Sequence, residues 1–354
     1  MKRLTWVDAA RGVAISLVAV LHATNWLLAG GLMIDGWLDV NVVLSSIRMP
    51  VFFTIAGLFA MKWLQGAWSP LLRDKVLLFV WVFLVWEVVG SVVGYAGMGL
   101  NGERTSVLRV VRDIVLSPVL PRLELWFIWA LALFFVLAKS TRKVDPRIQL
   151  AVAGATSFIA LSGWVFSNVG WGGVLRYYFF FLIGLYLRDM VFAFSRVRSR
   201  TLQSAVVVSW AASGTAMVAF DLQDFPGIYF INCVLGLLAG ICLGRALARI
   251  AVLSYLGSRT LPIYLGHTPI IITTVVILSG VGAISVAPRP LGVLLPVILP
   301  SLAIGLALVV NRLATRVGLD WLYQPPRRLV RALFGADGSP PADIRTDKRS
   351  AEQT

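Results

Sequence analysis

Residues 76–99 read VLLFVWVFLVWEVVGSVVGYAGMG, an apolar run interrupted by a single charged residue, Glu87. A helix of about 20 apolar residues crosses the roughly 30 Å hydrocarbon core of a bilayer. The rest of the chain agrees with this stretch, because 58% of its 354 residues are hydrophobic and its mean hydropathy is +0.83. Soluble domains are typically about 45–50% apolar. The sequence therefore predicts an integral membrane protein built from helices.

Further stretches of similar character lie on either side of this run. The predicted spans are 11–30, 39–61, 76–99, 122–138, 148–166, 174–192, 202–220, 227–244, 260–280 and 291–311. The first span follows Lys2 and Arg3 as a signal peptide would. Asp8 and Arg11 crowd its start, however, and no convincing cleavage site follows, so we expect it to be retained. The predicted fold class is all-α, with about ten transmembrane helices.

The charged residues between the spans predict the orientation. A net charge of +15 would suggest a nucleic acid or another acidic partner in a soluble protein. Here arginine and lysine gather in alternate loops and in the C-terminal tail, and cationic loops stay in the cytoplasm. Both termini should therefore be cytoplasmic. We expect a multi-pass protein of the cytoplasmic (inner) membrane, with a membrane domain over residues 1–315 and a basic, partly disordered tail over 316–354.

One loop departs from this charge pattern. Residues 101–122 are external in the predicted topology yet carry Arg104, Arg109, Arg112 and Arg122. The apolar residues of this loop recur at helical spacing. Two interpretations stay open: an interfacial helix that lies on the outer leaflet, or a surface that receives an anionic acceptor.

Ionisable side chains inside a bilayer are costly and mark candidate functional sites, and the first span carries two. Arg11 and His22 are separated by nearly three full turns, so both lie on one helix face about 16 Å apart. Asp8 shares that face and is placed to hold the guanidinium group. With the amino terminus inside, Arg11 lies at the cytoplasmic edge and His22 near the middle of the membrane.

Three other ionisable residues reach a similar depth in the predicted topology. Arg48 comes shortly before Pro50, which should break or kink the second span. Glu87 lies in the third span and His267 in the ninth. The chain has only two histidines, and both are predicted inside the membrane at comparable depth.

Each of these residues also has a purely structural interpretation. A membrane histidine can be a packed hydrogen-bonding residue, an Arg48–Glu87 pair can simply join two helices, and Arg11 can be an anchor at the membrane surface. Cys233 and Cys242 fall on opposite faces of one helix and are interpreted as packing residues. No ligand cluster with metal-binding spacing appears, so no metal site is predicted.

Several sequence elements, in order along the chain, resemble the acyltransferase 3 family of membrane-bound acyltransferases. They are Arg11-x10-His22 within DAARGVAI (8–15), RMPVFFTIAG (48–57), LWFI (125–128), and LG (256–257) followed by LPIYLGHTP (261–269). The elements cover most of the membrane region, and the Arg–His element combined with RMPVFF is fairly specific. Two positions depart from the pattern: Ala56 replaces the usual serine, and Glu124 precedes the LWF element where other polar residues are common.

The resemblance implies transfer of an acyl group, expected to be acetyl, from a cytoplasmic acyl-coenzyme A to a hydroxyl of a glycan or lipid-linked sugar. A histidine suits a general base because its unperturbed pKa is about 6.5, and we assign that role to His22. Arg11 is expected to bind a phosphate or the pantetheine carbonyl of the donor. Arg48 and Glu87 are further candidates for donor or transition-state binding.

Tyr264, His267 and Trp126 are candidates for orienting or contacting the acceptor. No cofactor is expected to be bound permanently, since acyl-coenzyme A is a co-substrate. The other expected partners are the glycan or lipid-linked acceptor and the lipid bilayer, and no nucleic acid is expected.

Two other classes of function stay open at this point. A secondary transporter or proton-coupled exporter would use the intramembrane His, Arg and Glu residues as a proton relay or substrate site, although no convincing two-half repeat is present. A non-catalytic scaffold would rely on helix packing, for which the glycine ridge Gly236, Gly240 and Gly244 is suited, and predicts that His22 is replaceable. With the resemblance counted, acyl transfer is the leading hypothesis.

Overall fold

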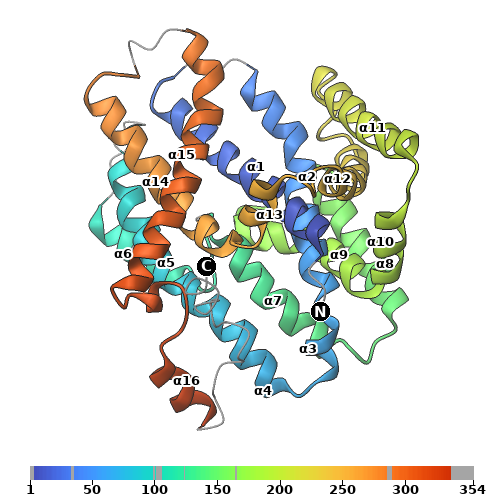
Figure 1. Cartoon of the computed structure of the whole chain (residues 1–354). Coiled ribbons are helices and arrows are strands. Elements are labelled where there is room, and N and C mark those ends of the chain that lie inside the picture. The colour runs from blue at the N-terminus through green and yellow to red at the C-terminus, as the bar shows by residue number, and fades with distance from the viewer. Residues whose placement is uncertain are drawn as a thin grey trace, which may run out of the picture.

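The computed structural model describes residues 4–32, 36–98, 100, 106–122, 124–163, 166–284 and 289–335. All regular secondary structure within these ranges is helical (Figure 1). The prediction of an all-α membrane protein is therefore confirmed. The expected disorder beyond residue 338 and the arginine at position 104 lie outside the described residues.

The helices differ widely in length. Their order is α1 (Thr5–Ala29), α2 (Trp37–Leu58), α3 (Met61–Gln65), α4 (Trp68–Leu71), the π-helix η1 (Leu72–Val76), α5 (Leu77–Met98), α6 (Val107–Leu116), α7 (Trp126–Ser140), α8 (Pro146–Ala160), α9 (Val169–Tyr186), α10 (Arg188–Arg196), α11 (Arg200–Ala219), α12 (Ile228–Ala246), α13 (Ala251–Gly257), α14 (Thr260–Gly280), α15 (Arg289–Arg316), the 3-10 helix η3 (Asp320–Leu322) and α16 (Arg327–Phe334).

Eight of the described helical stretches are long and apolar enough to cross a membrane. They are Thr5–Ala29, Trp37–Leu58, Trp68–Tyr95, Val169–Tyr186, Arg200–Ala219, Ile228–Ala246, Thr260–Gly280 and Gly292–Arg316. The two remaining predicted spans correspond to α7 and α8, which have 15 residues each. Fifteen residues give only about 22 Å of helix. Of the ten predicted spans, eight thus correspond to full-length helices and one to the short apolar helix α7, while α8 is not among the helices apolar enough to cross a membrane.

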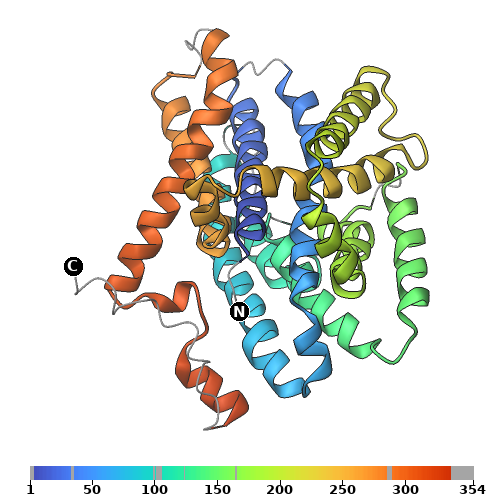
Figure 2. The ribbon, with the colours of Figure 1, turned by 45° about the vertical axis from the view of Figure 1, so that its right-hand side comes forward.

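Helix α1 lies inside the bundle and contacts α2, α12, α13, α14 and α15 (Figures 1 and 2). Its sequence allows this because small residues occupy much of its buried surface, so that neighbouring helices can approach closely. Against α13, for example, a Cβ atom on Gly12 would lie 2.1 Å from the carbonyl oxygen of Leu253. The first span is therefore surrounded mainly by elements from the last third of the chain.

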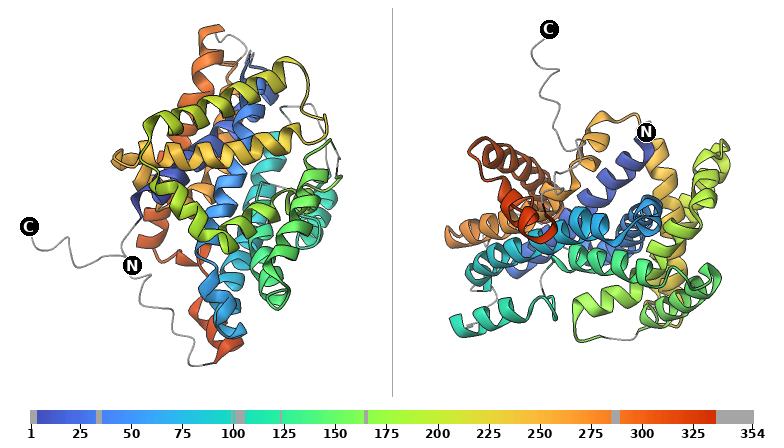
Figure 3. Two further views of the ribbon diagram at one scale, coloured as in Figure 1. Left: turned by 90° about the vertical axis from the view of Figure 1, so that its right-hand side faces the viewer. Right: turned by 90° about the horizontal axis from the view of Figure 1, so that it is seen from below.

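The predicted glycine ridge on α12 makes the close approach expected of it. A Cβ atom on Gly236 would lie 2.3 Å from the carbonyl oxygen of Ser46 on α2, and one on Gly244 would lie 2.7 Å from the Cβ atom of Ala10 on α1. Helix α11 runs beside α12 on the outer flank (Figure 3). The ridge thus joins α12 to both helices that carry the Arg–His and RMPVFF elements.

Helix α2 is continuous through Pro50, so the second span does not break there, while the alternative of a kink stays a prediction. Proline removes one backbone donor and is tolerated in membrane helices where neighbouring groups satisfy the freed carbonyl or approach it closely. The carbonyl group of Ser46, which would accept from the missing N–H, lies against α12 at Gly236. Close packing there holds the helix together across the proline.

A short hairpin formed by α3 and α4 follows α2 and is held by a buried lysine on α7. Lys139 is 1% exposed, and its ammonium group donates to the carbonyl oxygens of Trp63 (2.7 Å), Gly66 (2.7 Å) and Ala67 (2.9 Å). Three donors and three acceptors satisfy this cation completely. The charge pattern counts Lys139 among the cations between predicted spans, whereas in the structure it is a buried clamp on these three carbonyl groups.

The segment after the last span returns to the bundle before it ends (Figure 2). The indole N–H groups of Trp81 and Trp86 on α5 donate to the carbonyl oxygens of Trp321 (2.6 Å) and Leu322 (2.7 Å) in η3. The ring of Trp86 also packs against Tyr323, with centroids 5.6 Å apart. Part of the predicted basic tail is therefore ordered and attached to the third span.

Residues 107–116 of the basic loop form the predicted amphipathic helix, α6, which Ser106 caps by accepting from the Arg109 backbone N–H (3.2 Å). Its apolar residues Val107 and Leu108 are 66% and 78% exposed. Arg112 and Arg122 both pair with Asp113. The helix is confirmed, while its place at the outer leaflet stays a prediction.

Candidate functional site

The two histidines of the chain meet at the interface of α1 and α14. The rings of His22 and His267 have centroids 5.3 Å apart and an interplanar angle of 54°. This contact bears out the expectation, made from their depth in separate spans, that they lie at a comparable level. They form the centre of the candidate site.

His267 is fully buried, and partners on its own helix fix its tautomer. Its Nδ1 atom lies 2.9 Å from the carbonyl oxygen of Ile263. A carbonyl oxygen can only accept, so Nδ1 carries the proton. Its Nε2 atom, 3.2 Å from the Thr268 hydroxyl, is then the acceptor. Both nitrogens are engaged locally, and the ring presents mainly a packing surface to His22.

His22 has a different environment, because a carboxylate from another part of the chain faces it. The Nδ1 atom of His22 lies 3.7 Å from Oε1 of Glu124, and the two side chains are 16% and 25% exposed. The separation is longer than a direct hydrogen bond, as is common for catalytic contacts in the absence of substrate. A carboxylate at this place favours the His22 tautomer with Nδ1 protonated and leaves Nε2 as a base.

Glu124 was noted in the sequence only as a departure from the family pattern. It lies in the turn directly before α7, and its backbone carbonyl accepts a hydrogen bond from the Tyr264 hydroxyl. A charged residue next to an apolar run is normally taken as the boundary of a span. Because α7 is short, its first turn lies beside His22 instead of at the membrane surface. The short apolar run that follows Glu124 was the one signal in the sequence that could have pointed to this residue.

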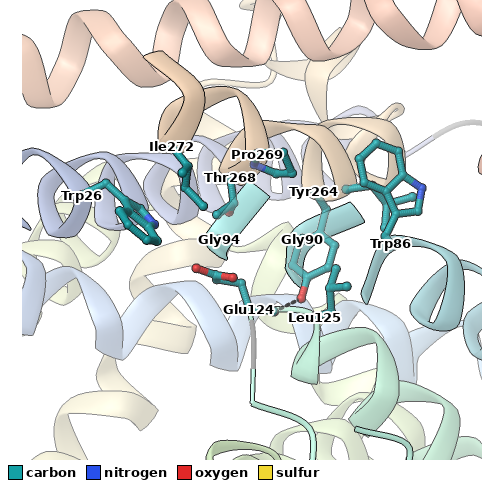
Figure 4. Close-up of a pocket in the computed structure, with 11 residues that line it drawn as sticks. Trp26, Trp86, Gly90, Gly94, Glu124, Leu125, Tyr264, Thr268, Pro269 and Ile272 are labelled. Atoms are coloured by element: carbon teal, nitrogen blue, oxygen red, sulfur yellow. Dashed lines mark hydrogen bonds between the residues drawn. The ribbon is translucent and has the colours of Figure 1, made fainter. Parts of the chain in front are cut away.

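A partly open pocket of about 40 Å³ adjoins this group. Its lining residues are Trp26, Trp86, Gly90, Gly94, Glu124, Leu125, Tyr264, Leu265, Thr268, Pro269 and Ile272 (Figure 4). A space of this size holds a few water molecules or one small polar group. Glu124 and Tyr264 supply its main polar surface.

Glu87 lies on α5, between Trp86 and Gly90, which both line this pocket. It is 3% exposed, and among the described residues its Oε2 atom has no hydrogen-bond partner. It interacts electrostatically with Glu124 and with Tyr264. A buried, unsatisfied carboxylate next to a second one is a costly arrangement in a membrane protein. The site therefore contains two carboxylates and two histidines.

Arg48 lies at the same level but is held by its own helix and by α1. Its guanidinium group donates to the Asn41 side chain (2.9 Å), to the Asn41 carbonyl (3.0 Å) and to the Leu17 carbonyl (3.3 Å). Its charge acts on His22. No ion pair joins Arg48 to Glu87 in the part of the chain that the structure describes, so the structural interpretation of these two residues as a stapling pair is wrong. Asn41 was not predicted as the partner.

Arg11 lies at the other end of α1, away from this group. Its guanidinium carbon lies 5.6 Å from the centroid of Phe59, and it interacts electrostatically with Asp8. In the same region, the Nζ atoms of Lys62 and Lys75 lie 4.7 and 5.4 Å from the centroid of the Trp63 ring. Lys75 interacts electrostatically with both Arg11 and Lys62. The residues Arg11, Lys62 and Lys75 form a cluster that we call the basic cluster.

Trp126 lies apart from the pocket, within an aromatic group. Its ring stacks on Tyr177 with centroids 6.0 Å apart and packs against Phe53 at 6.2 Å. Within the described ranges, no group of three or more His, Cys, Asp or Glu side chains is arranged to hold a metal ion. The structure thus brings together His22, His267, Tyr264, Arg48 and Glu87, and leaves Arg11 and Trp126 outside.

These features define a multi-pass membrane protein with a polar centre enclosed by its helices. The chain belongs to the acyltransferase 3 family, since the sequence model of that family, described as an acyltransferase domain, matches residues 4–310. It is therefore a membrane acyltransferase. A curated relative, the inner membrane protein YcfT of Escherichia coli (strain K12), is 21% identical over 348 residues, covering 91% of this chain and 96% of the relative. No solved structure matches the chain.

Proposed function

We propose that this protein transfers an acyl group, expected to be acetyl, from cytoplasmic acyl-coenzyme A to a hydroxyl of a glycan or lipid-linked sugar. The observation that carries the proposal is the approach of the Glu124 carboxylate to Nδ1 of His22, 3.7 Å apart. A carboxylate–histidine pair with a free Nε2 atom is the arrangement that general-base catalysis of acyl transfer requires. Membership of an acyltransferase family supports the same reaction class.

In the proposed mechanism, Nε2 of His22 takes the proton of the acceptor hydroxyl as its oxygen attacks the thioester carbonyl. A carbon–oxygen bond forms and the carbonyl becomes an oxyanion, which the nearby charge of Arg48 stabilises. The carbon–sulfur bond then breaks, and the imidazolium returns the proton to the leaving thiolate of coenzyme A. Glu124 orients the ring and stabilises its charged form between these two steps. The products are the acyl ester and free coenzyme A.

The basic cluster is the proposed binding region for the polyanionic part of the donor. Arg11, Lys62 and Lys75 combine a planar guanidinium group, which suits phosphate oxygens, with two ammonium groups. Arg11 is about 16 Å along α1 from His22, and an extended pantetheine arm is suited to such a distance. The thioester would then reach His22 while the nucleotide stays at the end of the bundle predicted to be cytoplasmic.

The pocket beside Glu124 is the proposed place for the acceptor hydroxyl. Its volume of about 40 Å³ suits one hydroxyl-bearing group and not a whole sugar ring. Tyr264, which lines the pocket, would orient that group, while His267 would act through its contact with the His22 ring. Trp126 is the weakest acceptor candidate, because it contacts Tyr177 in the aromatic group and does not line the pocket.

Coenzyme A release by the purified full-length protein in lipid nanodiscs tests the proposal. The assay uses acetyl-coenzyme A as donor, a membrane extract as acceptor source, and radiolabel in the acetyl group to follow its transfer. Replacing His22 with Gln should lower the transfer rate by about 10²- to 10⁴-fold, the usual contribution of a general base. Glu124→Gln keeps the size of the side chain and should lower the rate by at least about 10-fold through loss of ring orientation.

The matched control is Asp189→Asn, the same kind of change at an exposed carboxylate on α10, outside the candidate site. All variants are compared at equal amounts of monodisperse protein, which separates loss of chemistry from loss of folding. Transfer by His22→Gln at the wild-type rate would refute the assignment of the base. Uptake of a solute into proteoliposomes, without acyl transfer by the wild-type protein, would favour the transporter hypothesis instead.

A further inference from the structure

The eight-residue helix α16 (RRLVRALF) has two chemically distinct faces. Leu329, Val330, Leu333 and Phe334 lie on one side at spacings of one, three and four residues, so they form an apolar stripe. Arg327, Arg328 and Arg331 lie toward the other side and are exposed. Leu333, at the centre of the apolar stripe, is 58% exposed. The helix therefore presents unburied apolar surface next to three cations.

The position of α16 explains why this surface is not covered by the protein. The two indole hydrogen bonds to Trp321 and Leu322 attach η3 to the bundle, and Pro325 and Pro326 then separate it from α16. Figures 1 and 2 show α16 standing away from the spans, below the end of α15. The chain thus holds the start of α16 at a fixed place at the end of the last span. Its apolar face is left partly exposed, since Leu333 is exposed while Leu329, Val330 and Phe334 are half-buried.

The charges on and beside α16 indicate which kind of surface covers its apolar face. Helix α16 contains three arginines and no acidic residue, and the exposed Arg316 ends the preceding span. Trp321 beside them is 44% exposed, and tryptophan is typical of the membrane–water interface. A basic amphipathic helix next to a transmembrane span is suited to the surface of a bilayer that contains anionic lipids.

We propose that α16 lies on the bilayer surface at this end of the molecule, with Leu333 and its apolar neighbours among the acyl chains and its three arginines on anionic phospholipid headgroups. This interaction is independent of the proposed acyl transfer. It predicts that anionic lipid, and not lipid in general, determines whether α16 is docked.

The test places a fluorescent probe on α16 of the full-length protein. Leu333→Cys carries an environment-sensitive probe on the apolar face, and Ala332→Cys carries it at an exposed control position. The unmutated chain controls for labelling of Cys233 and Cys242, which are both buried. Each protein is placed in nanodiscs of phosphatidylcholine alone or with one third phosphatidylglycerol, and quenching by acrylamide, an uncharged quencher, is measured.

We expect quenching at position 333 to fall severalfold in the anionic nanodiscs, with little change at position 332. High salt should restore quenching at position 333, because it screens the headgroup contacts. We also test a variant with Arg327, Arg328 and Arg331 all changed to Gln. In anionic nanodiscs, its quenching at position 333 should equal that of the protein with all three arginines in neutral nanodiscs. Each cation near an anionic leaflet strengthens association about fivefold, so the three substitutions should weaken docking roughly a hundredfold.

Three results would overturn the proposal. Equal quenching at positions 333 and 332 in both lipids would mean that α16 stays in water. Protection at position 333 that is as strong in pure phosphatidylcholine would mean that anionic headgroups are not required. Protection that persists in detergent micelles and rises with protein concentration would identify a second copy of the chain as the occupant. The salt titration needs no charge variant, so the outcome does not depend on the triple substitution being tolerated.

Discussion

His22 on α1 and His267 on α14 face each other with ring centroids 5.3 Å apart, yet they are not equivalent. His267 is 0% exposed and bonded through both nitrogens to groups of its own helix. His22 is partly exposed and has its Nδ1 atom toward Glu124. The two rings therefore differ in their burial and in their hydrogen-bond partners.

This difference predicts unequal effects of substitution. His267→Asn keeps a side chain that can hydrogen-bond locally, so the transfer rate should fall by less than about tenfold. His22→Asn should lower the transfer rate by at least about a hundredfold. Both variants are measured with radiolabelled acetyl-coenzyme A under identical conditions. A loss at His267 as large as that at His22 would show that both rings take part in the chemistry.

Arg11→Lys should affect donor binding more than turnover. Lysine keeps the charge of the basic cluster but not the planar fork that fits phosphate. The KM for acetyl-coenzyme A should rise about tenfold with kcat changed by less than threefold, the pattern expected when uniform binding is lost. Arg198→Lys, at an exposed position, is the control and should leave both constants unchanged. An unaltered KM in Arg11→Lys would make Arg11 a membrane anchor.

Lys139→Met should destabilise the protein. Methionine matches the length of the lysine stem but leaves the carbonyl groups of Trp63, Gly66 and Ala67 without their donor. Losing three bonds to a buried cation costs about 3 kcal/mol or more, so the apparent Tm in detergent should fall by several degrees. Lys143→Met, at an exposed position in the loop that follows α7, should change the Tm little. Equal Tm values for Lys139→Met and the wild-type protein would show that the Lys139 clamp contributes nothing to stability.

Gly236→Ala tests the close packing of α12. The added methyl group would lie 2.3 Å from the carbonyl oxygen of Ser46, so α12 has to move away from α2 at a cost of about 1–3 kcal/mol. Gly305→Ala is the matched control, since a Cβ atom there meets nothing within 4 Å and alanine favours helix. We expect a lower Tm for the first variant and an equal or higher Tm for the second. A lower Tm for Gly305→Ala than for Gly236→Ala would contradict the close packing of α12 against α2.

The sequence predicted those features that depend on local pattern. Long apolar runs predicted the helices of the membrane domain, and the small-residue spacing at Gly236 and Gly244 predicted close contacts of α12. The positions of His22 and His267 within their spans predicted that the two residues lie at a comparable depth. Each of these inferences needs only the rise of a helix and its hydrophobic period.

Features that depend on the relative position of distant segments were missed. The place of Glu124 follows from the short length of α7 and from where that helix begins in depth, which hydropathy does not give. Lys139 is buried because carbonyl groups of the α3–α4 hairpin converge on it, and a loop cation gives no sign of this. Asn41 was overlooked as the partner of Arg48 because an amide carries no charge that would mark it.

The surroundings of α1 have a consequence for biosynthesis. Helix α1 contacts α12, α13, α14 and α15, and Trp86 in the wall of the pocket donates to the Leu322 carbonyl. A nascent chain inserts its spans in sequence order, so His22 enters the membrane before His267, which lies on α14. The candidate site is thus completed only after α14 has been inserted, and a product terminated before α14 would lack it.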